Sequence, residues 1–164
     1  YEGPSPTRAL RFSTMILSVI LLFSLTAMAA DGPYDNYLKA SDVEKAAGLK
    51  GVKLVAKGAL SGAGGDLNFA TADNKLIVMI QVVGSSQYVG YKKYFFTADI
   101  KGVGDQAMEG ATIAGLPSNV VAFTKGAECV ALTTFGNPAG DGKKNMLTVS
   151  QMTALARTIA SRMK

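Results

Sequence analysis

The chain has 164 residues, a scattered net charge of +5, no histidine and a single cysteine, Cys129. So mild a charge excludes the basic footprint of a nucleic-acid-binding protein. Without histidine there are no Ser-His or Cys-His nucleophile systems and no histidine-based zinc site, and one cysteine permits neither an intramolecular disulfide nor a cysteine-rich metal site. The sequence therefore predicts no metal, no cofactor and no nucleic-acid partner, and a fold held together by packing.

The N-terminal segment has the pattern of a secretory signal. Two arginines precede an apolar run over residues 15–25, and Ala27 and Ala29 then supply the A-x-A motif of a cleavage site. The run is much shorter than the roughly 20 residues that span a bilayer. We expect residues 1–30 to be a signal peptide, with an upstream extension or retention as an anchor left open. Residues 31–164 are then one domain, periplasmic or secreted, with no membrane span.

The first half of this domain is predicted as one helix followed by three strands. Ser41 and Glu44 have the spacing of a capping box that begins a helix, and Gly48 is placed to end it. Strands are expected at 52–57, 66–72 and 75–83, with a glycine-rich loop at 58–65 and a tight turn at residues 73–74. Residues 76–80 are all apolar, as expected of a central strand covered on both faces.

The second half is predicted as a helix at 87–96, three strands and a last helix. A strand after residue 106 is followed by a hairpin over 119–135 that turns at Gly126. Thr148 and Gln151 form a second capping box before an apolar helical stripe. The fold class is thus α+β: an antiparallel sheet of about five to six strands flanked by three helices, in the order α-β-β-β-α-β-β-β-α.

The stretch GVGDQAMEG, residues 102–110, begins with the spacing of a dinucleotide-binding fingerprint, G-x-G-x-x-A. That fingerprint follows a parallel strand, opens a helix and meets an acidic residue about 20 positions later. Here the preceding residues 97–101 have the character of a loop, and no acid lies near Val121. We therefore predict that Gly102 and Gly104 are backbone hinges, that Asp105 caps the turn, and that the stretch is a joint in the fold that fixes how the helix at 87–96 meets the hairpin at 119–135.

The segment YVGYKKYFF, residues 88–96, is the most distinctive candidate for binding. Tyr88 and Tyr91 with Lys92 and Lys93 are candidates to stack on and hold an anionic or aromatic ligand. The alternative is an amphipathic helix whose aromatic side packs on the sheet while the lysines face water. No catalytic residue is predicted. Hydrolysis by paired carboxylates is the less favoured reading, and it would draw on Asp66, Asp73, Asp99, Asp105, Glu109 and Glu128.

The whole pattern resembles the PsbP-like α-β-α sandwich, which recurs in exported mycobacterial lipoproteins and in sensor domains of receptor kinases. The resemblance is carried by short motifs at residues 37–45, 102–107 and 120–125 and by the closing helix at 155–163. It implies a non-catalytic sensor or accessory module, and no catalytic residues carry over from it.

These observations predict a secreted or periplasmic binding or accessory protein that recognises a small ligand or an envelope protein beside the helix at 88–96. The alternative is a structural or assembly component of the cell envelope, in which a partner engages the apolar strand at 76–83 and the loop at 58–65. The identity of the ligand or partner and the oligomeric state stay open.

Overall fold

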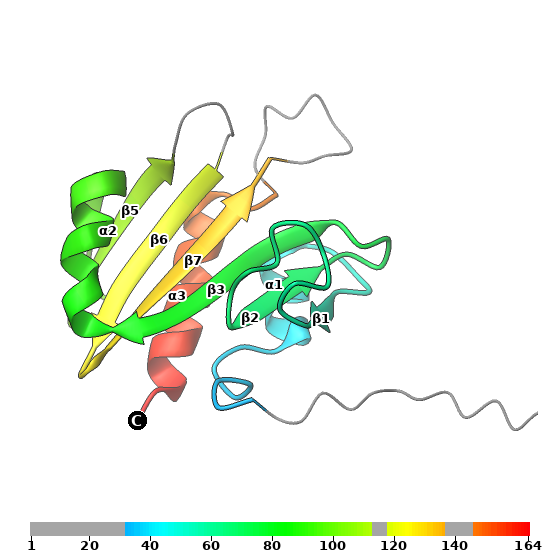
Figure 1. The fold of residues 1–164 in the computed structure, drawn as a ribbon, viewed down its shortest axis with the longest axis horizontal. Coiled ribbons are helices and arrows are strands. Elements are labelled where there is room, and N and C mark those ends of the chain that lie inside the picture. The colour runs from blue at the N-terminus through cyan, green and yellow to red at the C-terminus, as the bar shows by residue number, and fades with distance from the viewer. Residues whose placement is uncertain (1–31, 113–117, 137–145) are drawn as a thin grey trace, which may run out of the picture.

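The structure is a computed structural model that describes residues 32–112, 118–136 and 146–164 (Figure 1). The expected signal peptide lies outside these residues. The elements, in chain order, are α1 (Ala40–Ala47), β1 (Lys53–Val55), β2 (Leu67–Ala70), β3 (Leu76–Gly84), the 3-10 turn η1 (Ser85–Gln87), α2 (Tyr88–Phe95), β4 (Phe96–Ile100), β5 (Gln106–Thr112), β6 (Ser118–Lys125), β7 (Glu128–Phe135) and α3 (Val149–Arg162).

The α+β class is confirmed, with one antiparallel sheet of seven strands in the order β1-β2-β3-β7-β6-β5-β4. The predicted count of five to six strands was slightly low, because four strands, not three, follow α2. The missed strand is β4, where the sequence predicted a loop. β4 lies at the edge of the sheet and pairs only with β5, with a bulge near Thr97. The bulge interrupts the regular alternation of a strand, which is why these five residues were not recognised as one.

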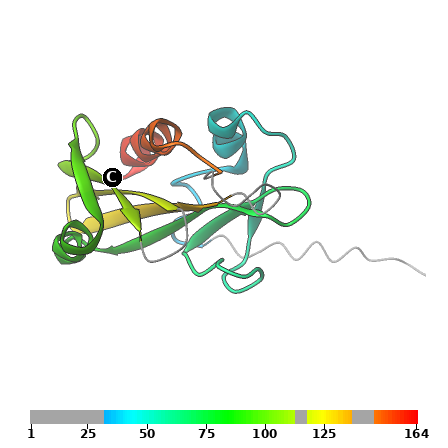
Figure 2. The ribbon, with the colours of Figure 1, turned by 90° about the horizontal axis from the view of Figure 1, so that it is seen from above.

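The sheet is covered on both faces, as Figure 2 shows: α1 and α3 lie on one side and α2 on the other. The face toward α1 and α3 carries the larger core, in which Phe69, Phe123 and Leu132 pack with Met152 and Ile159 of α3. The face toward α2 carries a smaller cluster composed of Tyr88, Met108, Ala122, Cys129 and Ala131. Since successive strand residues point to opposite faces, one ladder supplies both clusters.

Helix α1 begins two residues earlier than its predicted capping box. Asp42, rather than Glu44, accepts the backbone N–H of the N-cap residue Lys39, at 2.8 Å. Glu44 instead accepts the N–H of Val52 at 3.0 Å, so its carboxylate connects α1 to the approach to β1. The predicted end is confirmed, because Gly48 has a φ of 67° in the left-handed region.

Helix α3 begins as predicted. The Thr148 hydroxyl accepts the N–H of Gln151 at 3.2 Å, and the Gln151 side chain accepts the N–H of Thr148 at 2.8 Å. The other end of α3 is held by Lys125 of β6, whose Nζ donates to the carbonyls of Ala160 and Met163 at 2.6 and 2.7 Å. Helix α3 is therefore fixed to the sheet by polar contacts as well as by its apolar stripe.

Two further contacts define how the layers are joined. Arg162 of α3 donates to both carboxylate oxygens of Asp42 in α1, at 2.6 and 2.9 Å. The Tyr37 hydroxyl donates to Glu128 of β7 at 2.6 Å. Cys129, on the opposite face, is fully buried, and burial raises the pKa of its thiol to about 11, so it is protonated at neutral pH.

Two further findings concern a predicted partner-binding strand and membrane spans. The apolar strand predicted at 76–83 is an interior strand, since β3 pairs with β2 on one side and with β7 on the other. Both backbone edges are paired over residues 78–80, whereas β2 does not extend beside residues 81–84. Across the three described ranges of the chain, none of the helices has the length and apolar character that crossing a bilayer would require.

Candidate functional site

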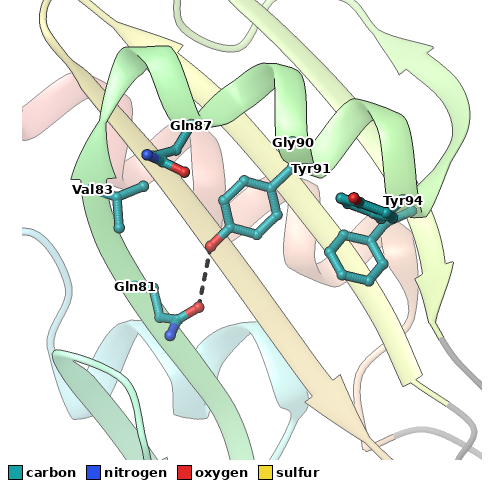
Figure 3. A pocket seen from close by; sticks show the side chains of 7 residues that line it. Gln81, Val83, Gln87, Gly90, Tyr91 and Tyr94 are labelled. Atoms are coloured by element: carbon teal, nitrogen blue, oxygen red, sulfur yellow. Dashed lines mark hydrogen bonds between the residues drawn. The ribbon is translucent and has the colours of Figure 1, made fainter.

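A hollow of about 400 Å³ lies between α2 and β3, on the face of the sheet away from α1 and α3 (Figure 3). Its lining comes from three consecutive elements: Gln81 and Val83 of β3, Gln87 of η1, and Gly90, Tyr91, Tyr94 and Phe95 of α2. We call this hollow the α2 pocket.

Local geometry explains why these residues meet. Gln81 and Val83 are two positions apart in β3, so both point to the same face of the sheet. The short turn η1 then reverses the chain, and α2 packs across β5 and β6. The Tyr91 hydroxyl donates to Oε1 of Gln81 at 3.1 Å, which links the helix directly to β3 (Figure 3). Burial raises the pKa of Tyr91, so its hydroxyl keeps its proton.

The lining combines aromatic rings with amides and has no charged side chain. The ring centroids of Tyr91 and Phe95 are 5.9 Å apart, and those of Tyr94 and Phe95 are 6.4 Å apart. Tyr94 is 70% exposed, so its ring is accessible. Gln81 and Gln87 offer amide donors and acceptors. These features suit an uncharged ligand with a flat apolar face and a hydrogen-bonding edge.

The structure does not bring the four predicted ligand-binding residues together. Tyr91 lines the α2 pocket. Tyr88 is only 3% exposed, and it lines a different hollow, together with Lys92 and Lys93. Lys92 pairs with Asp99 at 3.1 Å. Tyr88 is buried and Tyr91 half-buried, whereas Lys92 and Lys93 are exposed, so three of the four predicted residues share one hollow and Tyr91 lines the other.

Sequence reasoning missed the β3 side of the α2 pocket. Gln81 and Val83 lie in a strand that the sequence presented only as apolar and covered. One signal was available: Gln81 is a polar residue that interrupts the apolar run of β3. Such an interruption indicates a site where the strand makes a polar contact, and Gln81 accepts the hydrogen bond of the Tyr91 hydroxyl there.

The predicted turn residues lie elsewhere, in the connection between β4 and β5. Gly102 and Gly104 have φ values of 74° and 56°, which favour glycine. A Cβ on Gly104 would overlap the carbonyl oxygen of Thr124. Asp105 accepts the N–H of Gly126 at 2.8 Å. The turn therefore fastens the β4–β5 hairpin to the β6–β7 hairpin.

The carboxylates are dispersed over the described residues, where no three of the His, Cys, Asp and Glu side chains form a group that could hold a metal ion. Asp35 and Asp66 do line one small hollow of about 190 Å³. Each carboxylate there accepts a backbone N–H at 2.7 Å, from Gly32 and Val82 respectively. Both are thus already engaged in holding the backbone.

Comparison with protein-family models, with curated proteins and with solved structures found no match to this chain. The resemblance to PsbP-like domains therefore rests on its short motifs alone.

Proposed function

We propose that this chain is an exported, non-catalytic binding or accessory protein that holds a small uncharged ligand in the α2 pocket. The observation that carries the proposal is the composition of that pocket. Three aromatic rings and two glutamine amides converge on one hollow, and no charged side chain lines it. Its volume of about 400 Å³ falls in the range of small-molecule sites, roughly 300 to 1,000 Å³.

The pocket also sets the expected strength of binding. A ligand of about 15 to 20 non-hydrogen atoms gains roughly 0.3 kcal/mol per atom, or about 4.5 to 6 kcal/mol in total. This corresponds to a Kd of roughly 0.04 to 0.5 mM. Because Tyr94 is the most exposed ring of the pocket, a ligand can stack on it without moving the helix.

The test is a fluorescence titration with the neutral aromatic dye N-phenyl-1-naphthylamine. Saturable binding is expected, weakened about fivefold by Tyr94→Ala, since one aromatic contact contributes about 1 kcal/mol beyond its buried area. Val89→Ala is the matched control, because Val89 is 72% exposed on α2 and lies outside the pocket. Unsaturable binding, or equal effects of the two variants, would refute the proposal. Export is tested separately by fusing residues 1–30 to a reporter that is active only outside the cytoplasm.

Assembly is the second candidate, and one specific observation favours it. Val89, Tyr94 and Phe96 are large, exposed apolar residues in α2 and at the start of the edge strand β4. Large apolar side chains exposed on one helix and on the strand that follows it are candidates for a protein contact. Light scattering at increasing concentration distinguishes the two candidates: self-association abolished by Val89→Ser with dye binding intact supports assembly.

A further inference from the structure

A second hollow lies on the opposite side of the protein from the α2 pocket, where the last turn of α3 meets the ends of two hairpins. Its volume is about 360 Å³. It is lined by Gly102, Gly104, Asp105, Lys125, Arg157, Ala160 and Ser161 and shares no residue with the α2 pocket. We call it the α3 pocket.

Arg157 is the first unusual feature of the α3 pocket. Its side chain is exposed, and it has no hydrogen bond, ion pair or ring contact with any residue that the structure describes. The other arginine of α3, Arg162, is by contrast held by both oxygens of Asp42. A guanidinium presents a planar fork of donors that matches a carboxylate or phosphate group. Arg157 is thus available for such a group.

Lys125 is the second feature, because its ammonium is fixed in place but not neutralised. Its Nζ donates to two carbonyls, of Ala160 and Met163, which leaves one of its three donors unused. Over the described parts of the chain, no carboxylate lies within ion-pair distance of it. The side chain is half-buried. A positive charge held in this way needs little reorganisation to meet an anion.

The other residues that line the α3 pocket leave space for a ligand and determine the net charge of the lining. Gly102 has no side chain, and a Cβ there would meet nothing within 4 Å. Asp105 contributes one negative charge, although one of its oxygens is engaged by the N–H of Gly126. Two cations and one carboxylate give the lining a net charge of +1, so the α3 pocket favours a single anionic group.

We propose that the α3 pocket binds one oxyanion, a carboxylate or phosphate group of a small molecule. Arg157 is its main contact and Lys125 its second. The site is independent of the uncharged ligand proposed for the α2 pocket.

The test is an NMR titration of the ¹⁵N-labelled protein with inorganic phosphate and, separately, with acetate, at constant ionic strength set by sodium chloride. Saturable shifts are expected at the amides of Gly102, Gly104 and Ser161. Arg157→Ala should weaken binding at least tenfold, since a hydrogen bond to a charged group contributes roughly that much. Arg157→Lys should restore only part of the affinity, because it keeps the charge but not the fork.

Two matched variants make the outcome decisive. Lys101→Ala removes an equal charge next to Gly102 but outside the lining, so less than a twofold change is expected. Asp105→Asn keeps an oxygen for the Gly126 N–H and removes the opposing charge, so binding should tighten several-fold. Saturation by phosphate or by acetate identifies which group the site prefers. Saturation by neither, or equal losses in Arg157→Ala and Lys101→Ala, overturns the proposal. Dye binding in the α2 pocket should be unchanged in Arg157→Ala.

Discussion

Gly110→Ala is expected to destabilise the protein and to deform the α2 pocket by displacing the end of α2. Gly110 is a buried residue of β5, opposite Phe96 in the β4–β5 ladder. A Cβ at this position would overlap the carbonyl oxygen of Phe95 and lie 2.6 Å from its carbonyl carbon and 3.1 Å from its Cβ. Two of these three atoms are backbone, so no change of rotamer relieves the overlap. The end of α2 must move.

The size of the effect follows from the atoms involved. Inserting a carbon into a packed core costs about 1 to 3 kcal/mol, and a contact with backbone lies toward the upper part of that range. We expect a loss of about 2 to 3 kcal/mol in the free energy of unfolding. For a domain of this size that lowers Tm by roughly 6 to 15 °C. Since Phe95 lines the α2 pocket, dye affinity should fall as well.

Thermal and urea unfolding followed by circular dichroism measure this loss, and Gly90→Ala is the control. A Cβ on Gly90 would meet nothing within 4 Å, and the residue lies inside α2. Alanine there should therefore stabilise the protein, by up to about 1 kcal/mol. Opposite signs for the two alanine variants are the expected result. If Gly110→Ala were as stable as the parent protein, the close approach of β5 to α2 and the reasoning built on it would be refuted.

Two further predictions concern pH. The hydrogen bonds from Arg162 hold the pKa of Asp42 below its usual value, so the pair stabilises the fold above the unfolded pKa, near 4, and this stabilisation is lost as pH falls through the folded pKa. The Tm difference between the parent protein and Arg162→Met should therefore shrink on acidification. A Tm difference that does not depend on pH would contradict this. Burial, with the hydrogen bond to Glu128, raises the pKa of Tyr37 to about 12, so the stabilisation of the fold by Tyr37 is complete below the unfolded pKa, near 10, and is lost between about pH 10 and 12. Absorbance titration at 295 nm should show that Tyr37→Phe removes a tyrosine that ionises at high pH. Loss of a tyrosine that ionises near pH 10 would count against the assignment.

The elements that the sequence predicted well are those specified by neighbouring residues. The β6–β7 hairpin turns at Gly126, with a φ of 57°, and the β2–β3 hairpin at Asn74, with a φ of 67°. The residues that make such turns adjoin the strands that they connect, so the signal is local. The same holds for the capping box of α3. By contrast, the N-cap of α1 lies two residues before the predicted position. Glu44 accepts the N–H of Val52 instead of capping the helix, and local spacing does not encode that contact.

Only the α2 side of the α2 pocket could be predicted, because the contacts between α2 and β3 are not encoded by local spacing. Tyr91 was predicted from the helix that carries it, but Gln81 and Val83 come from β3, and only the turn at η1 and the packing of α2 bring them together. The α3 pocket is more extreme, since its two cations belong to β6 and α3. Residues 102–105 were recognised as a motif from the sequence. They form one wall of the α3 pocket because the strand order places the ends of the β4–β5 and β6–β7 hairpins side by side.

The two faces of the sheet are held with different strength, and this bears on where the protein can adapt. Helix α3 is anchored by a large apolar core, and Lys125 and the Arg162–Asp42 pair add polar contacts. Helix α2 rests on a small cluster, and the buried Tyr88 hydroxyl there has no hydrogen-bond partner among the described residues. Few buried apolar contacts mean low local stability. The α2 pocket is thus bounded on one side by the less firmly anchored of the two helices α2 and α3, whereas the α3 pocket is built on the more firmly anchored one, where pre-positioned charges are most effective.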